Sequence, residues 1–214
     1  MIEAIAEERK RTVNGRQMVK KMMIALSQLI VMPLVVPCKL EEWLSEGKAE
    51  TVFGFSAQLV AMLPGMPGAF LRKAFYSLTL KSCSTDCHIG FGTLFAHRSS
   101  VIEQHVYIGT YAIIGSAHIG EYSLIGSRAS IISRQTLHTM GSDGRWTSYS
   151  SDAVVPTTIA KNVWVGEGCT IAADIGEGSQ ISSGSVVTTD IKPGILVGGN
   201  PPRFIKNIDI PVAS

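Results

Sequence analysis

The chain has 214 residues, enough for one large domain or two small ones. Its formal net charge is +2, so neither a basic nor an acidic bias indicates a nucleic-acid partner. Hydrophobic residues make up 45% and charged residues only 17%, a balance typical of a chain whose surface is partly covered by partners.

Residues 1–80 differ from the rest and are predicted to form a mainly helical segment. The mostly apolar run from Met22 to Pro37 is shorter than the 20 or so apolar residues of a spanning helix, and it contains proline. No small-x-small cleavage site of a signal peptide follows it. We therefore expect a packing helix; the alternative is peripheral membrane contact, which the preceding basic cluster favours. That cluster comprises Arg9, Lys10, Arg11, Arg16, Lys20 and Lys21.

A second apolar segment, 53–76, contains the turn signal Pro64-Gly65-Met66-Pro67-Gly68, which predicts two short helices. Solenoid proteins need covered ends. We expect both apolar segments to cover the open end of the repeats that follow.

From Ile102 onward an aliphatic residue recurs about every six residues, usually followed by a small one. Six residues suit one short strand and a tight corner, whereas a helix would show apolar spacings of three and four. The pattern predicts an all-β solenoid, a parallel β-helix, over residues 81–207, followed by a tail at 208–214. The repeat positions are Ile102, Ile108, Ile114, Ile119, Ile125, Ile131, Ile159, Val165, Ile171, Ile175, Ile181 and Val187.

Three stretches in this order resemble the hexapeptide-repeat acyltransferases, and in particular the sugar and xenobiotic O-acetyltransferases. Residues 159–166 are similar to the family's IG-x-N-VWIG stretch, 183–190 to its SGSVVTKD stretch and 198–205 to its GGNPARVI stretch. The resemblance implies a left-handed parallel β-helix with three hexapeptides per coil. It also implies a homotrimer with active sites between neighbouring subunits.

The repeat is interrupted most extensively at 133–158, where a long polar loop is expected to be functional. In the family, a histidine at the root of this loop removes the proton of an acceptor hydroxyl, and His138 matches that position. Asp143 and Asp152 are both candidates to orient its ring. Two other histidines, His97 and His118, are candidates to line an acceptor pocket between subunits.

The resemblance also implies acetyl coenzyme A as the acyl donor, lying along the later coils. Two departures from the family pattern are Thr189, where a lysine is common, and Glu167, which replaces a small residue. No metal is expected, because Cys83, Cys87 and the adjacent His88 have no second pair of ligands at zinc-like spacing. The residues matching the family's donor contacts are Gly166, Ser183, Gly184, Thr188, Thr189, Arg203 and Lys206.

The predicted function is that of an acetyl-coenzyme A-dependent O-acetyltransferase acting on a sugar or glycan hydroxyl. A non-catalytic β-helix that acts as an assembly scaffold is one alternative. A zinc hydratase of the carbonic anhydrase kind is another, disfavoured because no two histidines are five residues apart. The donor implies a cytoplasmic location, at the inner face of a membrane if the N-terminal segment contacts one.

Overall fold

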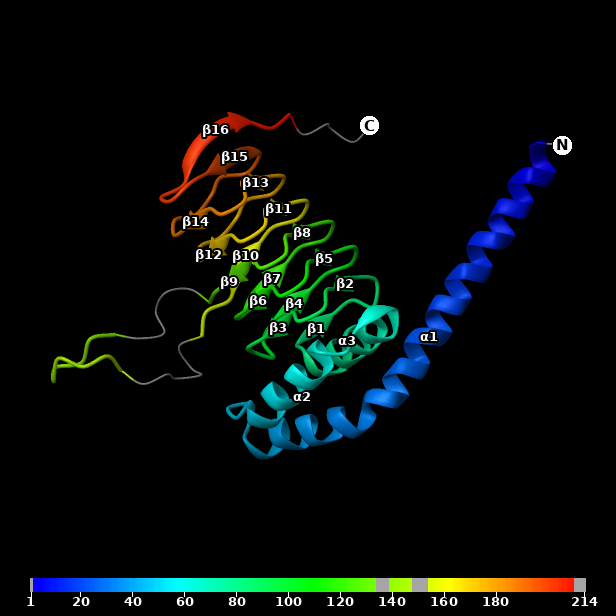
Figure 1. The fold of residues 1–214 in the computed structure, drawn as a ribbon, viewed down its shortest axis with the longest axis horizontal. Helices are drawn as coiled ribbons and strands as arrows, with labels where there is room; N and C mark the ends of the chain where they lie inside the picture. The colour runs from blue at the N-terminus through cyan, green and yellow to red at the C-terminus, as the bar shows by residue number, and fades with distance from the viewer. Residues whose placement is uncertain (1, 134–138, 148–153, 210–214) are drawn as a thin grey trace.

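The computed structural model describes residues 2–133, 139–147 and 154–209 (Figure 1). Three helices come first: α1 (Ile2–Leu44), α2 (Thr51–Ala61) and α3 (Gly65–Thr79). Short parallel strands then stack into a solenoid, with the helices at one end of the stack and β16 at the other.

The strands form three sheets, which we call A, B and C, and each full coil contributes one strand to each sheet in turn. Sheet A contains β1 (Ser82–Cys83), β4 (Val101–Ile102), β7 (Ala117–Ile119) and β10 (Thr157–Ile159). Sheet C contains β3 (Leu94–Phe95), β6 (Ile113–Ile114), β9 (Ser130–Ile131), β12 (Thr170–Ile171) and β14 (Val186–Val187). Sheet B contains β2 (His88–Ile89), β5 (Tyr107–Ile108), β8 (Leu124–Ile125), β11 (Trp164–Val165), β13 (Gln180–Ile181), β15 (Ile195–Gly198) and the antiparallel β16 (Arg203–Asn207).

The six-residue repeat positions pair with one another across coils. Ile108 aligns with Ile125 in sheet B, and Ile114 aligns with Ile131 in sheet C. The side chains at these positions are buried in one continuous core. The predicted parallel β-helix is therefore confirmed. Ile175 and Ile191 continue sheet A as single bridges, so the solenoid begins a sixth coil at Ile191.

The helices cover the open end of the first coil, as expected for a solenoid cap. The Tyr76 ring packs on Phe95, with 4.6 Å between ring centroids. Buried Arg72 donates from Nε to the Ile89 carbonyl at 3.0 Å, and the Gly92 amide donates to the Ala61 carbonyl at 2.9 Å. These bonds occupy edge groups of the first coil that no earlier coil pairs with.

The first helix is longer than the apolar run suggested. It continues from Ile2 to Leu44 through Pro33 and Pro37, which each remove one backbone donor from the helix and allow it to curve. Figure 1 shows α1 curving under α2. Its inner side packs on α3 and α2, and Val31 and Val35 of α1 are buried in the common core.

One boundary of the extruded loop differs from the prediction. Thr157 and Thr158 lie in β10, where they pair with Ala117 and His118 of β7. The returning chain therefore rejoins the stack two residues earlier than predicted. The prediction placed the end of the loop directly before the repeat position Ile159, which is the last residue of β10 and not its first.

We expect Gly126→Ala to destabilise the protein by about 1–3 kcal/mol, the usual cost of overpacking. A Cβ at Gly126 would lie 2.6 Å from the Glu167 amide nitrogen of the next coil. The matched control is Gly54→Ala in α2, where a Cβ meets nothing within 4 Å and alanine favours the helix. Thermal unfolding should show a lower midpoint for the first variant alone; equal midpoints would contradict the coil-contact argument.

Candidate functional site

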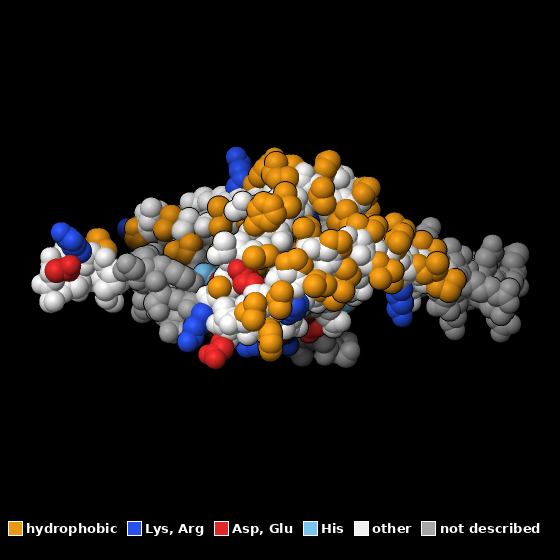
Figure 2. All heavy atoms as spheres, turned by 90° about the horizontal axis from the view of Figure 1, so that it is seen from below, with side chains coloured by type: hydrophobic (Ala, Val, Ile, Leu, Met, Phe, Trp, Pro, Cys, Tyr) orange, Lys and Arg blue, Asp and Glu red, His pale blue; other side chains and the backbone are white. Residues whose placement is uncertain are grey.

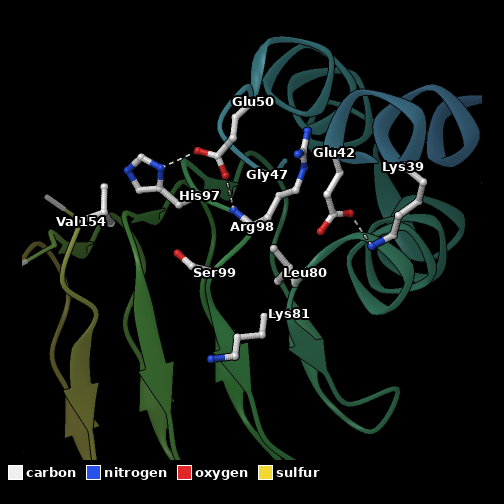
Figure 3. A pocket seen from close by; sticks show the side chains of 10 residues that line it. All are labelled: Lys39, Glu42, Gly47, Glu50, Leu80, Lys81, His97, Arg98, Ser99 and Val154. Carbon is white, nitrogen blue, oxygen red and sulfur yellow. Dashed lines mark hydrogen bonds and ion pairs between the residues drawn. The ribbon is translucent and has the colours of Figure 1, made fainter. Parts of the chain in front are cut away.

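A cavity of about 480 Å³ opens where the helical cap meets the corner between sheets C and A (Figure 3). Its walls come from the end of α1, the connection between α1 and α2, the end of α3, the turn after β3, and the chain returning from the extruded loop. It is lined by Lys39, Glu42, Gly47, Glu50, Leu80, Lys81, His97, Arg98, Ser99 and Val154. Most of these residues are charged or polar, and Leu80 and Val154 add apolar surface.

The His97 ring is held in place by Glu50. Its Nδ1 lies 2.7 Å from Glu50 Oε2, and Glu50 Oε1 accepts the Arg98 amide at 2.7 Å. A carboxylate at Nδ1 favours the tautomer that carries its proton there. Figure 3 shows the ring on the side of the cavity where Val154 returns from the loop.

Arg98 joins the solenoid to the cap beneath this cavity. Its guanidinium pairs with Glu41 of α1 and donates to the Ala49 carbonyl at 3.0 Å. Burial alone would raise the pKa of Glu41. The Val52 and Phe53 amides and the Arg98 cation outweigh burial, so the pKa of Glu41 lies below its ordinary value. The carboxylate therefore stays ionised and holds three elements together.

The extruded loop leaves the solenoid at the same corner, two coils above the cavity floor. Ser99 Oγ lies 2.7 Å from Ser116 Oγ, and the Ser116 amide donates to Ser133 Oγ at 2.9 Å. Where the loop returns, Thr157 Oγ1 donates to the Ile132 carbonyl at 2.7 Å. A ladder of serines thus connects the cavity to the root of the loop.

The predicted base, His138, lies outside the described residues, as does Asp152. The loop tip is described. There Met140 pairs with Trp146, and Asp143 Oδ1 accepts the Arg145 amide at 3.1 Å. Asp143 therefore stabilises the turn at the tip of the loop.

Two candidate acceptor-pocket histidines were named from the sequence, and one of them, His97, lines the cavity. His118 is absent from the cavity lining and lies on sheet A, with Nε2 2.7 Å from Glu103 Oε1. That bond and the Glu121 amide lower the pKa of Glu103. His118 is thus half of a hydrogen-bonded pair on the surface.

The predicted donor residues fall at two corners of the later coils. Ser183 and Gly184 are exposed between sheets B and C, and a Cβ on Gly184 would meet nothing within 4 Å. Thr188 and Thr189 are exposed after β14, at the corner between sheets C and A. The outer surface of sheet C therefore separates the two pairs.

Two cations lie on the edge strand β16, which pairs with β15 of sheet B. Arg203 pairs with Gly198, and Lys206 with Leu196, and both side chains are exposed. The exposed hydroxyl groups and the cations can bind phosphate groups, and the glycine leaves room for a ligand to approach the backbone. A long ligand that carries phosphates fits this combination. Acetyl coenzyme A is such a ligand.

Gly166 and Glu167 have local structural explanations. A Cβ on Gly166 would lie 2.5 Å from the Ser183 amide nitrogen, so the close approach of the next coil requires glycine there. The Glu167 carboxylate is exposed and lies 3.5 Å from Arg128 Nη2. Its departure from the family pattern therefore adds a paired charge at the corner.

The two thiols near the first coil form no metal cluster with other side chains in the part of the chain that the structure describes. Cys83 Sγ and Cys87 Sγ are 3.9 Å apart, and no group of three or more His, Cys, Asp or Glu side chains is suitably placed among the described residues. Both cysteines are free.

Sequence reasoning missed Glu50, Arg98 and Glu41. Glu50 and His97 are 47 residues apart, and Arg98 and Glu41 are 57 apart. Local spacing carries no signal for such contacts. The only hint was that Arg98, a cation that turns out to be buried, directly follows a candidate histidine.

No family model matches the sequence. Among curated proteins, the galactoside O-acetyltransferase of Escherichia coli (strain K12) is 30% identical over 126 residues, which are 54% of this chain and 58% of that protein. A putative acetyltransferase of Saccharomyces cerevisiae (strain ATCC 204508 / S288c) is 43% identical over 56 residues, 25% of this chain and 29% of that protein. The matched regions thus span little more than half of the first relative and under a third of the second.

Solved structures share the fold. A maltose O-acetyltransferase from Clostridium difficile 630 has a TM-score of 0.64 and 21% identity, over 79% of this chain and 90% of that chain. A hexapeptide-repeat acetyltransferase from Vibrio cholerae O1 biovar eltor, complexed with acetyl coenzyme A, has a TM-score of 0.55 and 20% identity, over 73% and 86%. These findings confirm the resemblance to hexapeptide-repeat acetyltransferases and the left-handed β-helix it implied.

We expect Glu41→Gln to lower the free energy of unfolding by about 1.5–3 kcal/mol at pH 7, the range for hydrogen bonds to a charged group. Because the folded-state pKa of Glu41 is depressed, its contribution is complete above the ordinary value near 4.5 and is lost as pH falls through the folded value. Urea unfolding at pH 7, 4 and 3 should show the gap between wild type and variant closing at low pH.

The control for that series is Glu42→Gln, because Glu42 makes a surface pair with Lys39 at 2.8 Å. Its effect should stay below about 0.5 kcal/mol. A wild-type-to-Glu41→Gln gap that does not change with pH would contradict the ionised network.

Proposed function

We propose that this chain is an acetyl-coenzyme A-dependent O-acetyltransferase whose acceptor is a hydroxyl of a sugar or glycan. One observation carries the proposal: the loop that contains His138 is rooted at the corner that holds the polar cavity, and the chain returning from it supplies the cavity residue Val154. The galactoside and maltose O-acetyltransferases to which the chain is similar support the chemistry.

The proposed base is His138. An imidazole with a pKa near 6.5 can accept a hydroxyl proton at neutral pH. As the acceptor oxygen attacks the acetyl carbon, the imidazole takes the proton, the new ester C–O bond forms and the thioester C–S bond breaks. The imidazolium then returns the proton to the departing sulfur, so the histidine ends the cycle neutral.

The cavity is the proposed acceptor site. Its volume lies within the range of small-ligand pockets, about 300–1,000 Å³. Glu50, Lys39 and Lys81 offer charged acceptors and donors, and Ser99 offers a hydroxyl. A ligand with many hydroxyls can pair with such groups, whereas an apolar ligand would leave them unsatisfied.

The donor is proposed to contact Ser183, Gly184, Thr188 and Thr189, with Arg203 and Lys206 at its phosphates and Gly166 shaping the coil beneath. When bound, acetyl coenzyme A supplies the activated acetyl group as a thioester. The residues at the two corners would fix the position of that group relative to the loop.

A homotrimer is part of the proposal. Tyr107, Leu124 and Trp164 align across successive strands of sheet B, and all three are exposed on its outer face. A stripe of aligned large apolar side chains is a typical contact surface for another subunit. A solution mass of three chains would support this part of the proposal.

We expect His138→Ala to reduce acceptor-dependent thiol release from acetyl coenzyme A about 10²–10⁴-fold, the usual contribution of a general base. The assay uses a panel of sugar acceptors. The control is His105→Ala, which removes an exposed histidine that pairs with Asp86 at another corner. Full activity in His138→Ala would refute the base assignment. Absence of both release and acetyl-coenzyme A binding in wild type would favour the scaffold.

Arg203→Gln and Lys206→Gln should each raise the KM for acetyl coenzyme A about 10- to 100-fold with a smaller change in kcat, because each loses a charged contact to phosphate. Lys161→Gln is the control, since Lys161 is exposed and pairs with Glu177 at 3.3 Å. Unchanged KM values in both edge-strand variants would place the donor elsewhere.

A further inference from the structure

The side of α1 that faces away from the solenoid is covered with large apolar side chains, and the cover continues onto α2 and the start of α3. We call this surface the outer apolar face. Figure 2 shows this region, with hydrophobic side chains spread over the helices and few charged groups among them. It consists of Met18, Val19, Met22, Met23, Leu26, Leu29, Ile30, Met32, Val36, Leu40, Trp43 and Leu44 of α1 with Phe55, Leu59, Met62 and Met66.

The apolar side of α1 faces outward, whereas an ordinary surface helix exposes its polar side to solvent. Two polar side chains of α1 bond to the body of the protein. Gln28 Nε2 donates to Ser77 Oγ at 3.1 Å, and Lys20 pairs with Asp86. Meanwhile Leu29 is 70% exposed and Trp43 is 76% exposed. Solvent alone does not favour this orientation of α1.

The face is broad as well as apolar. Between α1 and the start of α3 lies an apolar groove of about 210 Å³, lined by Met23, Leu26, Ser27, Ile30, Met66, Pro67, Phe70 and Leu71. Exposed apolar surface that runs over three helices exceeds the scattered single residues of an ordinary soluble surface.

Charge indicates which partner covers the face. No charged residue occurs in 22–38, whereas residues 1–21 contain six Lys and Arg against the three acids Glu3, Glu7 and Glu8. Lys21, at the edge of the apolar run, is exposed. An apolar strip with a basic flank is the pattern of helices that bind anionic lipid surfaces.

We infer that the outer apolar face docks on a membrane surface that contains anionic phospholipid, with α1 lying in the plane of the interface. Gln17–Leu44 is long and apolar enough to cross a membrane by length and composition. However, Ile24, Val31 and Val35 are buried against the protein, so lipid cannot surround the helix. Embedding one side of α1 satisfies both facts.

The test is sedimentation of the full chain with vesicles of phosphatidylcholine alone or with about one third phosphatidylglycerol. Wild type should bind the anionic vesicles strongly and the neutral ones weakly. The triple variant Met22→Gln, Leu26→Gln, Leu29→Gln should bind the anionic vesicles at least about tenfold more weakly, because binding scales with the apolar area inserted. The matched control changes three exposed apolar residues of the solenoid, Ile113→Gln, Ile132→Gln and Phe204→Gln, and should bind as wild type.

A second readout does not depend on the triple variant folding normally. With Trp146→Phe and Trp164→Phe, the remaining Trp43 indole should shift its emission to the blue on anionic vesicles and be quenched by brominated lipid. Three results would overturn the inference: no vesicle binding by wild type, binding that persists in the triple variant, or a fall in solution mass in that variant without any vesicle binding by wild type. The last would assign the face to a second copy. None of these readouts depends on acetyl transfer.

Discussion

Each coil of the solenoid donates backbone amides to carbonyls of the coil that follows, and this ladder fixes the spacing on which the other features depend. Gly109 donates to Ile125, Gly126 to Val165 and Gly166 to Ile181, all at 2.8–2.9 Å. Backbones this close leave no room for a Cβ at these corners. The aliphatic residue before each glycine is directed inward by the same geometry. The distance between successive coils therefore determines both which side chains enter the core and which corner positions require glycine.

The ladder also explains why the extruded loop lies at a corner of the solenoid and the helical cap at one end. A coil in the middle of the stack has its backbone groups occupied above and below, so a long insertion can leave only where the chain turns. The loop at 132–156 leaves at such a corner. At the first coil the backbone groups on the outer edge have no neighbouring coil to bond with. There Arg72 donates to one edge carbonyl, and the Ala61 carbonyl of the cap accepts one edge amide.

Most of the fold could be predicted from the sequence, because the six-residue repeat is a local pattern. Each inward-facing aliphatic residue of the repeat marks the position of one strand. The site was predictable only in part. His97 could be named as a candidate, but its partner Glu50 comes from a connection 47 residues away. The helical cap brings them together, and no spacing within either segment carries that information. The length of α1 was also unpredictable, because local rules treat Pro33 and Pro37 as breaks, whereas packing against α3 supports the helix through them.

One feature of α1 links two parts of the molecule that have been described separately. The last turns of this helix contribute Lys39 and Glu42 to the cavity, while Leu40, Trp43 and Leu44 from the same turns belong to the outer apolar face. A rigid helix cannot move one side without the other. These shared turns are a physical route between the two surfaces, and by thermodynamic reciprocity any coupling along it changes the affinity for the partner of the outer face and for the cavity ligand by the same factor.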